Sequence, residues 1–138
     1  MRNAYILITL LIFSFSFSQE YRFNGGEMIY KLTDNNQWTF KDVKANDFKV
    51  FVNYPKRAIV FYYYVKIYNS SEKMEIVDVY EILNQKKYKN LKFYETKNKE
   101  GFSLWQFNED DLQTLIIYEK CDENFKNCMI RRDLKSLE

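Results

Sequence analysis

The chain has 138 residues and no histidine, and this absence excludes several kinds of site. Histidine is the commonest general base and metal ligand, so a serine–histidine–aspartate triad, a cysteine–histidine pair and an imidazole-bound metal cannot form. Two cysteines are too few for a four-thiolate zinc site or an iron–sulfur cluster, and three glycines cannot build a glycine-rich phosphate loop. We therefore expect no catalytic residue, cofactor-binding residue or metal ligand, and a protein that is not an enzyme.

Aromatic residues, in contrast, are abundant. They make up 19% of the chain, within a hydrophobic fraction of 46% that can support a folded core. Lysine and arginine (21) nearly balance aspartate and glutamate (19). This balance removes the broad electrostatic argument for a nucleic acid or an anionic membrane as partner.

Residues 1–18 have the pattern of a signal peptide. Arg2 precedes an uncharged apolar run over residues 4–17, which is shorter than the roughly 20 residues of a membrane-spanning helix. Ser16 and Ser18 suit the positions before a cleavage site, which predicts cleavage between Ser18 and Gln19. We expect a secreted or periplasmic protein with one β-rich domain over residues 19–138 and no stable membrane span after cleavage; an uncleaved anchor is the alternative.

Alternation with a period of two dominates the rest of the chain. Within residues 58–68, Phe61 and Tyr63 share one face and Tyr62 and Tyr64 the other, as in a β-strand. The other candidate strands are residues 27–32, 37–43, 48–54, 74–83, 91–96, 102–108, 114–120 and 128–134. Short strands at this spacing predict an all-β fold, a single small antiparallel barrel or sandwich of about eight or nine strands in meander order.

Residues 108–113 allow two interpretations. Asn108 and the acidic residues after it would cap a helix well, and Leu112, Leu115 and Ile116 lie at helical spacing. The β-branched run over residues 114–118 favours a strand. We prefer the strand and leave open whether a helix begins at 108–113.

Cys121 and Cys128 are separated by a polar segment, Asp122–Asn127. In an oxidising compartment, this spacing predicts a disulfide across the base of a hairpin loop. A redox-active pair is the weaker alternative, because the two cysteines do not form a Cys-x-x-Cys motif.

Tyr62 and Tyr64 share a strand face with Tyr68, and this stripe of rings is a possible binding face. Rigid amphipathic rings can contact a sugar, a peptide or a protein. The alternative is that these rings are partly buried on the wall of a barrel. Trp38 and Trp105 are expected to lie in the core or to close one end of the barrel.

One resemblance accompanies these patterns. Its elements are Ser18-Gln19 at the end of the signal peptide, Trp38, the strand–turn–strand over residues 49–62, and residues 74–77, 115–118 and 128–130. Together they resemble a loosely defined group of small exported proteins of Bacteroidota, most of them uncharacterised. The resemblance spans most of residues 38–134 and implies a compact, β-barrel-like domain without a defined activity.

The function expected from the sequence is non-catalytic binding or interaction outside the cytoplasm. The binding element would be a barrel cavity or the tyrosine face, and the partner a small apolar ligand, a glycan or another exported protein. The alternative is a carboxylate-dependent hydrolase acting on an envelope or extracellular polymer, since paired carboxylates are the one catalytic device that the composition permits.

Overall fold

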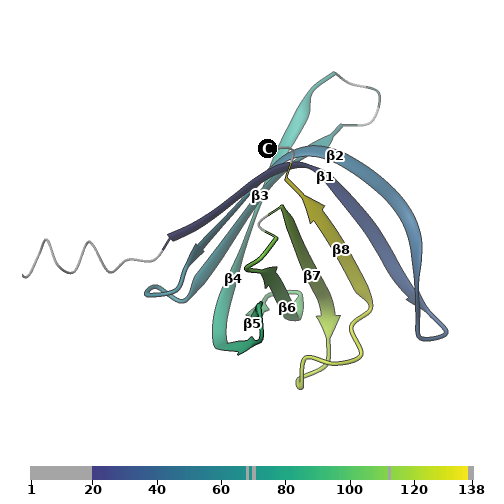
Figure 1. The fold of residues 1–138 in the computed structure, drawn as a ribbon. Helices are drawn as coiled ribbons and strands as arrows, with labels where there is room; N and C mark the ends of the chain where they lie inside the picture. The colour runs from purple at the N-terminus through teal and green to yellow at the C-terminus, as the bar shows by residue number, and fades with distance from the viewer. Residues whose placement is uncertain (1–19, 68, 70, 112, 137–138) are drawn as a thin grey trace, which may run out of the picture.

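The computed structural model is a closed barrel of eight antiparallel strands, and it describes residues 20–67, 69, 71–111 and 113–136. Each strand pairs with the next along the chain, and the last pairs with the first (Figure 1). The strands are β1 (Glu20–Asp34), β2 (Gln37–Asn53), β3 (Ala58–Lys66), β4 (Lys73–Tyr88), β5 (Leu91–Asn98), β6 (Gly101–Asn108), β7 (Thr114–Cys121) and β8 (Ile130–Lys135). The predicted all-β fold in meander order is therefore confirmed.

Several strand bounds differ from the sequence-based expectation: β1 and β4 are longer than the predicted 27–32 and 74–83, and β8 begins at Ile130 rather than at residue 128. Residues 37–43 and 48–53 belong to the single strand β2, because β1 pairs with β2 on both sides of a register shift between Gly25 and Glu27. Residues 108–111 form a turn, in which the Asn108 side chain accepts the N–H groups of Asp110 and Asp111. No helix long and apolar enough to cross a membrane occurs in the part of the chain that the structure describes.

Asparagines make the β1–β2 turn. Asn35 and Asn36 both have positive φ, at 49° and 61°. A two-residue hairpin turn of this kind matches the twist of the flanking strands, and asparagine tolerates positive φ better than most residues.

Aromatic side chains fill much of the barrel interior. A series of edge-to-face contacts joins Phe48, Phe61, Trp105 and Tyr80, with ring centroids 5.0–6.2 Å apart. All four side chains are buried, together with aliphatic residues from the same strands. An eight-stranded barrel is just wide enough for inward side chains to fill it, and these four rings do so, whereas others such as Phe40 and Tyr88 are exposed on the outside.

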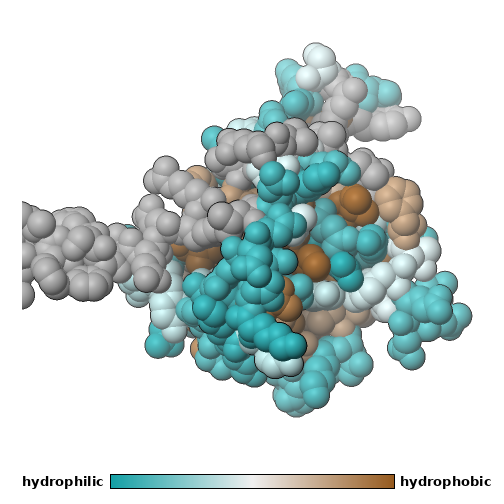
Figure 2. Space-filling model, viewed as in Figure 1, coloured by the Kyte–Doolittle hydropathy of each residue, from teal (hydrophilic) through white to brown (hydrophobic). Residues whose placement is uncertain are grey.

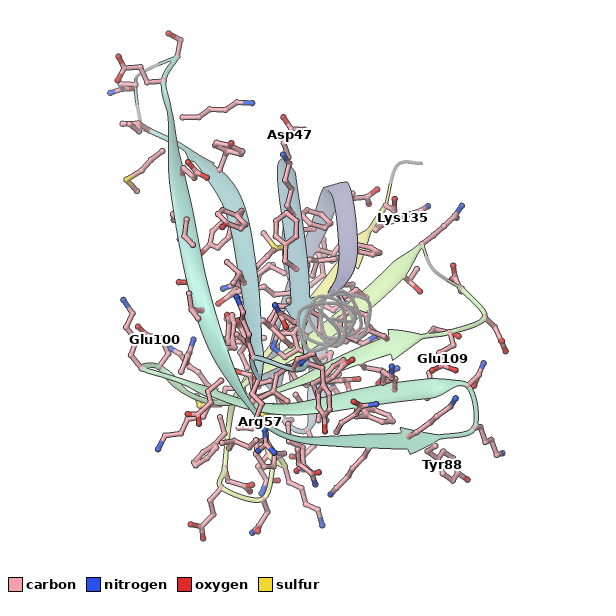
Figure 3. All side chains as sticks on the ribbon, turned by 90° about the vertical axis from the view of Figure 1, so that its left-hand side faces the viewer. Asp47, Arg57, Tyr88, Glu100, Glu109 and Lys135 are labelled. Carbon is pink, nitrogen blue, oxygen red and sulfur yellow. A yellow bond between two sulfur atoms is a disulfide. The ribbon has the colours of Figure 1, made fainter. Side chains whose placement is uncertain are left out.

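The inward side chains change from apolar to polar toward one end of the barrel. The inward residues in order are Ile59, Phe61 and Tyr63 on β3; Ile82, Tyr80 and Asp78 on β4; and Leu115, Ile117 and Glu119 on β7. The polar members lie toward the end of the barrel where the β5–β6 and β7–β8 connections are. We call this end the turn end. Figure 3 shows Glu100 of the β5–β6 turn far from Tyr88 and Glu109, which lie at the opposite end.

The outer surface is mixed in character. Hydrophilic residues cover most of the face in Figure 2, with smaller hydrophobic areas between them. Several aliphatic side chains of β4 are exposed on the outer wall, among them Val77 and Val79. Scattered exposed apolar residues of this kind are normal on folded proteins.

A disulfide joins Cys121 at the end of β7 to Cys128, as predicted. The enclosed loop is ordered around Asp122, whose carboxylate accepts the backbone N–H groups of Lys126 and Asn124 at 2.9 Å each. These hydrogen bonds, chiefly that from Lys126, hold the pKa of Asp122 below its ordinary value. By chain entropy, so short a cross-link stabilises the fold by about 2–3 kcal/mol.

Candidate functional site

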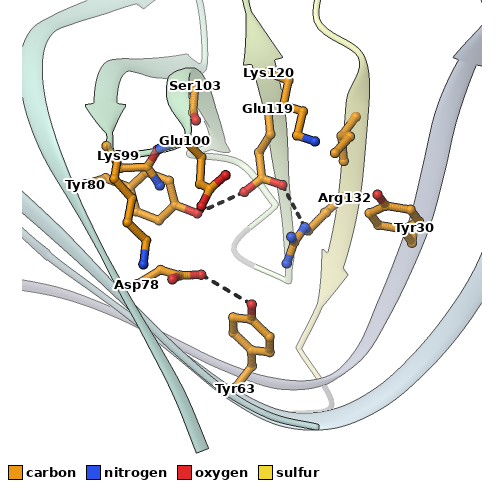
Figure 4. Close-up of a pocket in the computed structure, with 12 residues that line it drawn as sticks. Tyr30, Tyr63, Asp78, Tyr80, Lys99, Glu100, Ser103, Glu119, Lys120 and Arg132 are labelled. Carbon is orange, nitrogen blue, oxygen red and sulfur yellow. Dashed lines mark hydrogen bonds and ion pairs between the residues drawn. The ribbon is translucent and has the colours of Figure 1, made fainter.

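A pocket of about 330 Å³ opens at the turn end of the barrel. Six inward side chains form its inner wall: Tyr30, Tyr63, Asp78, Tyr80, Glu119 and Arg132 (Figure 4). They come from five strands, β1, β3, β4, β7 and β8. The pocket therefore gathers residues that are as much as 102 positions apart in the sequence, counting from Tyr30 to Arg132.

Glu119 is the centre of the polar contacts in this pocket, with one hydrogen bond and one ion pair. The Tyr80 hydroxyl donates to its Oε1 at 2.9 Å, and Nε of Arg132 lies 2.8 Å from its Oε2. The side chains of Arg132 and Glu119 are only 17% and 11% exposed, so this ion pair is largely removed from water. Each oxygen of the carboxylate therefore has its own partner on a different strand.

Arg132 is also held between two aromatic rings. Its guanidinium carbon lies 5.8 Å from the centre of the Tyr30 ring and 5.7 Å from that of Tyr63. Burial alone would lower the pKa of Arg132, but the charge of Glu119 and the neighbouring tyrosines outweigh burial, so its pKa is raised. Arg132 thus remains a fixed cation inside the barrel.

Two tyrosines connect the aromatic core to the pocket. Tyr80 packs its ring against Trp105, and Tyr63 packs its ring against Phe61 at 4.9 Å, while both hydroxyls reach carboxylates. Burial raises the pKa of Tyr80 well above its ordinary value, and the charge of Glu119 adds to the effect. Burial likewise raises the pKa of Tyr63. Both groups are therefore neutral hydrogen-bond donors at physiological pH.

Asp78 is the second carboxylate of the inner wall. Its Oδ2 accepts the Tyr63 hydroxyl at 3.3 Å. The pocket rim adds exposed charges from the β5–β6 turn and the end of β7, namely Lys99, Glu100 and Lys120. Within the described residues, no group of three side chains could hold a metal ion.

The predicted tyrosine face does not contribute to this pocket. Tyr62 and Tyr64 lie on the outer wall of β3, partly buried, and the Tyr62 ring contacts Phe51 at 5.5 Å. Tyr68 lies outside the described residues. A binding face at these positions stays a prediction.

The two tryptophans take different positions. Trp105 lies in the core, as expected, and its Nε1 has no hydrogen-bond partner within the described residues. Trp38 is partly exposed and packs its ring 6.0 Å from Tyr118. Neither residue lines the pocket.

Sequence reasoning did not find Asp78, Glu119 or Arg132. Each occupies an inward position in the alternating pattern, as in Leu115-x-Ile117-x-Glu119. A charged residue at a position whose neighbours two residues away are buried is unusual, since burying a charge is costly unless it is paired. A charged residue at an inward position was therefore the signal by which each of the three could have been found. That they lie together depends on how the strands pair, which the sequence pattern does not show.

Comparison of the chain with protein-family models, with curated proteins and with solved structures gives no match. The resemblance to exported proteins of Bacteroidota therefore stays a prediction. The chain forms an eight-stranded meander barrel with an aromatic core and a charged pocket at one end.

The first prediction concerns the buried ion pair. Replacing Arg132→Met leaves the buried Glu119 without its ion-pair partner and with only the Tyr80 hydroxyl as a contact among the described residues, so we expect the free energy of unfolding to fall by about 3–5 kcal/mol. The matched control is Lys87→Met, which breaks the exposed pair with Glu109 and should cost under about 1 kcal/mol. Urea unfolding measures both, and equal losses in the two variants would contradict the assignment.

The second prediction concerns alkaline pH. Because the pKa of Tyr80 is raised in the folded state above about 10, the unfolded chain loses this proton first, and stability falls as pH rises past 10. Tyr80→Phe removes this effect. We expect the stability advantage of wild type over Tyr80→Phe to be constant from pH 8 to 9 and to shrink by about 2 kcal/mol by pH 11.5. A gap that stays constant across this range would show that Tyr80 is not protected.

Proposed function

We propose that this protein binds a small polar ligand in the pocket at the turn end of its barrel. The observation that carries the proposal is the placement of Tyr80, Glu119 and Arg132 inside the barrel, where apolar side chains would fill the space at less cost. Buried charged groups in a concave site with a few convergent polar side chains are the usual mark of ligand recognition.

The size of the pocket sets the size of the ligand. Ligand-binding pockets commonly occupy about 300–1,000 Å³, and 330 Å³ is at the low end of this range. The aromatic core occupies the rest of the interior, from Phe48 to Trp105. A long fatty chain running through the barrel would have to displace that core, so a compact ligand fits better.

The lining favours a polar ligand over an apolar one. Carboxylate, guanidinium and phenol groups form most of the inner wall, and Ile130 is the aliphatic residue among the lining side chains. An apolar ligand would cover these groups without replacing their contacts with water, which costs free energy.

We further propose that binding takes place outside the cytoplasm, after cleavage between Ser18 and Gln19. The sequence of residues 1–18, which lie outside the described residues, supports export. The Cys121–Cys128 disulfide supports an oxidising compartment, either periplasmic or extracellular.

A hydrolase acting on a polymer is the second candidate. The observation in its favour is that two carboxylates, Asp78 and Glu119, line one pocket. Glu119 already has Tyr80 and Arg132 as partners, so proton transfer to a substrate would require both contacts to rearrange. Binding without turnover therefore explains the arrangement better.

The test is native mass spectrometry of the protein purified from the cells that make it naturally. We expect a folded monomer carrying a small adduct. Ser103→Phe adds a ring at a buried pocket-lining position and should lose the adduct. Ser71→Phe makes the same change in an exposed turn and should keep it.

Two outcomes would count against binding in this pocket. One is an empty wild-type monomer in repeated preparations. The other is an adduct retained at equal occupancy by a compact Ser103→Phe variant, which would place the ligand elsewhere. An adduct that is converted to a smaller product during incubation would instead favour the hydrolase.

A further inference from the structure

We propose that the ligand carries a protonated amine that pairs with Asp78. This inference rests on the proposed function of the pocket and adds the chemical class of the ligand. It follows from the charges of the inner wall, from the unused hydrogen-bonding capacity of Asp78 and from the rings beside it.

The inner wall holds three charged side chains, and only two of them neutralise each other. Arg132 and Glu119 form an ion pair at 2.8 Å. None of the ion pairs among the described residues includes Asp78, whose partner is the neutral hydroxyl of Tyr63. Among the inner-wall side chains, Asp78 is therefore the charged group without an ion-pair partner, although the side chain of the rim residue Lys99 extends toward it in Figure 4.

The hydrogen-bonding capacity of Asp78 is mostly unused. A carboxylate offers about four acceptor sites on two oxygens. Only Oδ2 accepts a bond from a described residue, and that bond is long at 3.3 Å. Figure 4 shows Asp78 projecting from β4 into the space between Tyr80 and Tyr63. An ammonium group with three N–H donors would use this capacity and compensate the charge at the same time.

Aromatic rings flank the same space. Tyr63 and Tyr80 both line it, and the faces of such rings attract cations. The pocket already contains one example, because Arg132 lies over the rings of Tyr30 and Tyr63. The repulsion between Arg132 and a second cation is offset by Glu119, which holds the guanidinium at 2.8 Å.

An anionic ligand fits this arrangement less well. The buried cation, Arg132, is already paired with Glu119, and an anion reaching it would also approach Asp78. Lys99 and Lys120 are exposed at the rim, where water and salt screen their charges. The charges of the inner wall therefore favour a cationic ligand over an anionic one.

Three probes of nearly equal shape test the charge directly: phenethylamine, 2-phenylethanol and 3-phenylpropionate. They share a phenyl ring and a two-carbon chain and differ in the end group, which is cationic, neutral or anionic. Isothermal titration calorimetry of the wild-type protein at pH 7 should show phenethylamine binding at least about tenfold tighter than either of the others, as a charge-assisted hydrogen bond provides.

The variant Asp78→Asn assigns the preference to one residue. Asparagine can still accept the Tyr63 hydroxyl but has no charge, so the preference for the amine should fall to within about threefold. Glu81→Gln removes a carboxylate from an exposed position of the same strand and should leave the preference unchanged.

The wild-type comparison decides the matter even if Asp78→Asn does not fold. Binding of the alcohol or the acid as tightly as the amine, lost in Ser103→Phe, would overturn the amine assignment and leave the proposed pocket in place. Failure of all three probes to bind would also overturn the amine assignment. The proposed function of the pocket would then be tested separately, by whether mass spectrometry finds an adduct.

Discussion

Closure of the barrel by the β1–β8 pairing is the constraint on which the rest of the structure depends. Once the sheet closes, every second side chain points into an interior just wide enough for side chains to meet. Rings such as Phe61 and Trp105 occupy the interior away from the turn end. Near the turn end the same inward positions hold Asp78, Glu119 and Arg132, so closure itself brings these charges together.

The burial of Glu119 and Arg132 distinguishes this end of the barrel from the apolar core. A charge inside a barrel is tolerated only when a partner and hydrogen bonds replace water. Glu119 meets this condition through Tyr80 and Arg132, and Arg132 meets it through Glu119 and two rings. Asp78 is partly exposed to the pocket and accepts one long hydrogen bond, from Tyr63. The proposal of a positively charged ligand rests on this difference between the two carboxylates: Glu119 has two partners and Asp78 has one.

Much of the fold could be predicted from the sequence, because strand alternation and turn residues are local signals. The inward face of β3, the turn at Asn35 and Asn36 and the Cys121–Cys128 disulfide all follow from near neighbours. The pocket could not be predicted in this way. Its residues are spread from β1 to β8, and which inward positions meet depends on strand register, including shifts that no local pattern specifies. The aromatic run near Tyr62 attracted attention because it is locally dense, whereas the residues that line the pocket are each isolated in the sequence.

The central claim is that the buried polar network serves binding rather than stability. The most direct test replaces the network with apolar side chains in one variant, Tyr80→Phe with Glu119→Met and Arg132→Met, and measures its free energy of unfolding in urea. Because no polar partner of this trio is then left unpaired, the account predicts a value equal to or above that of wild type. A loss of several kcal/mol would contradict it and would show that the network is present to stabilise the barrel.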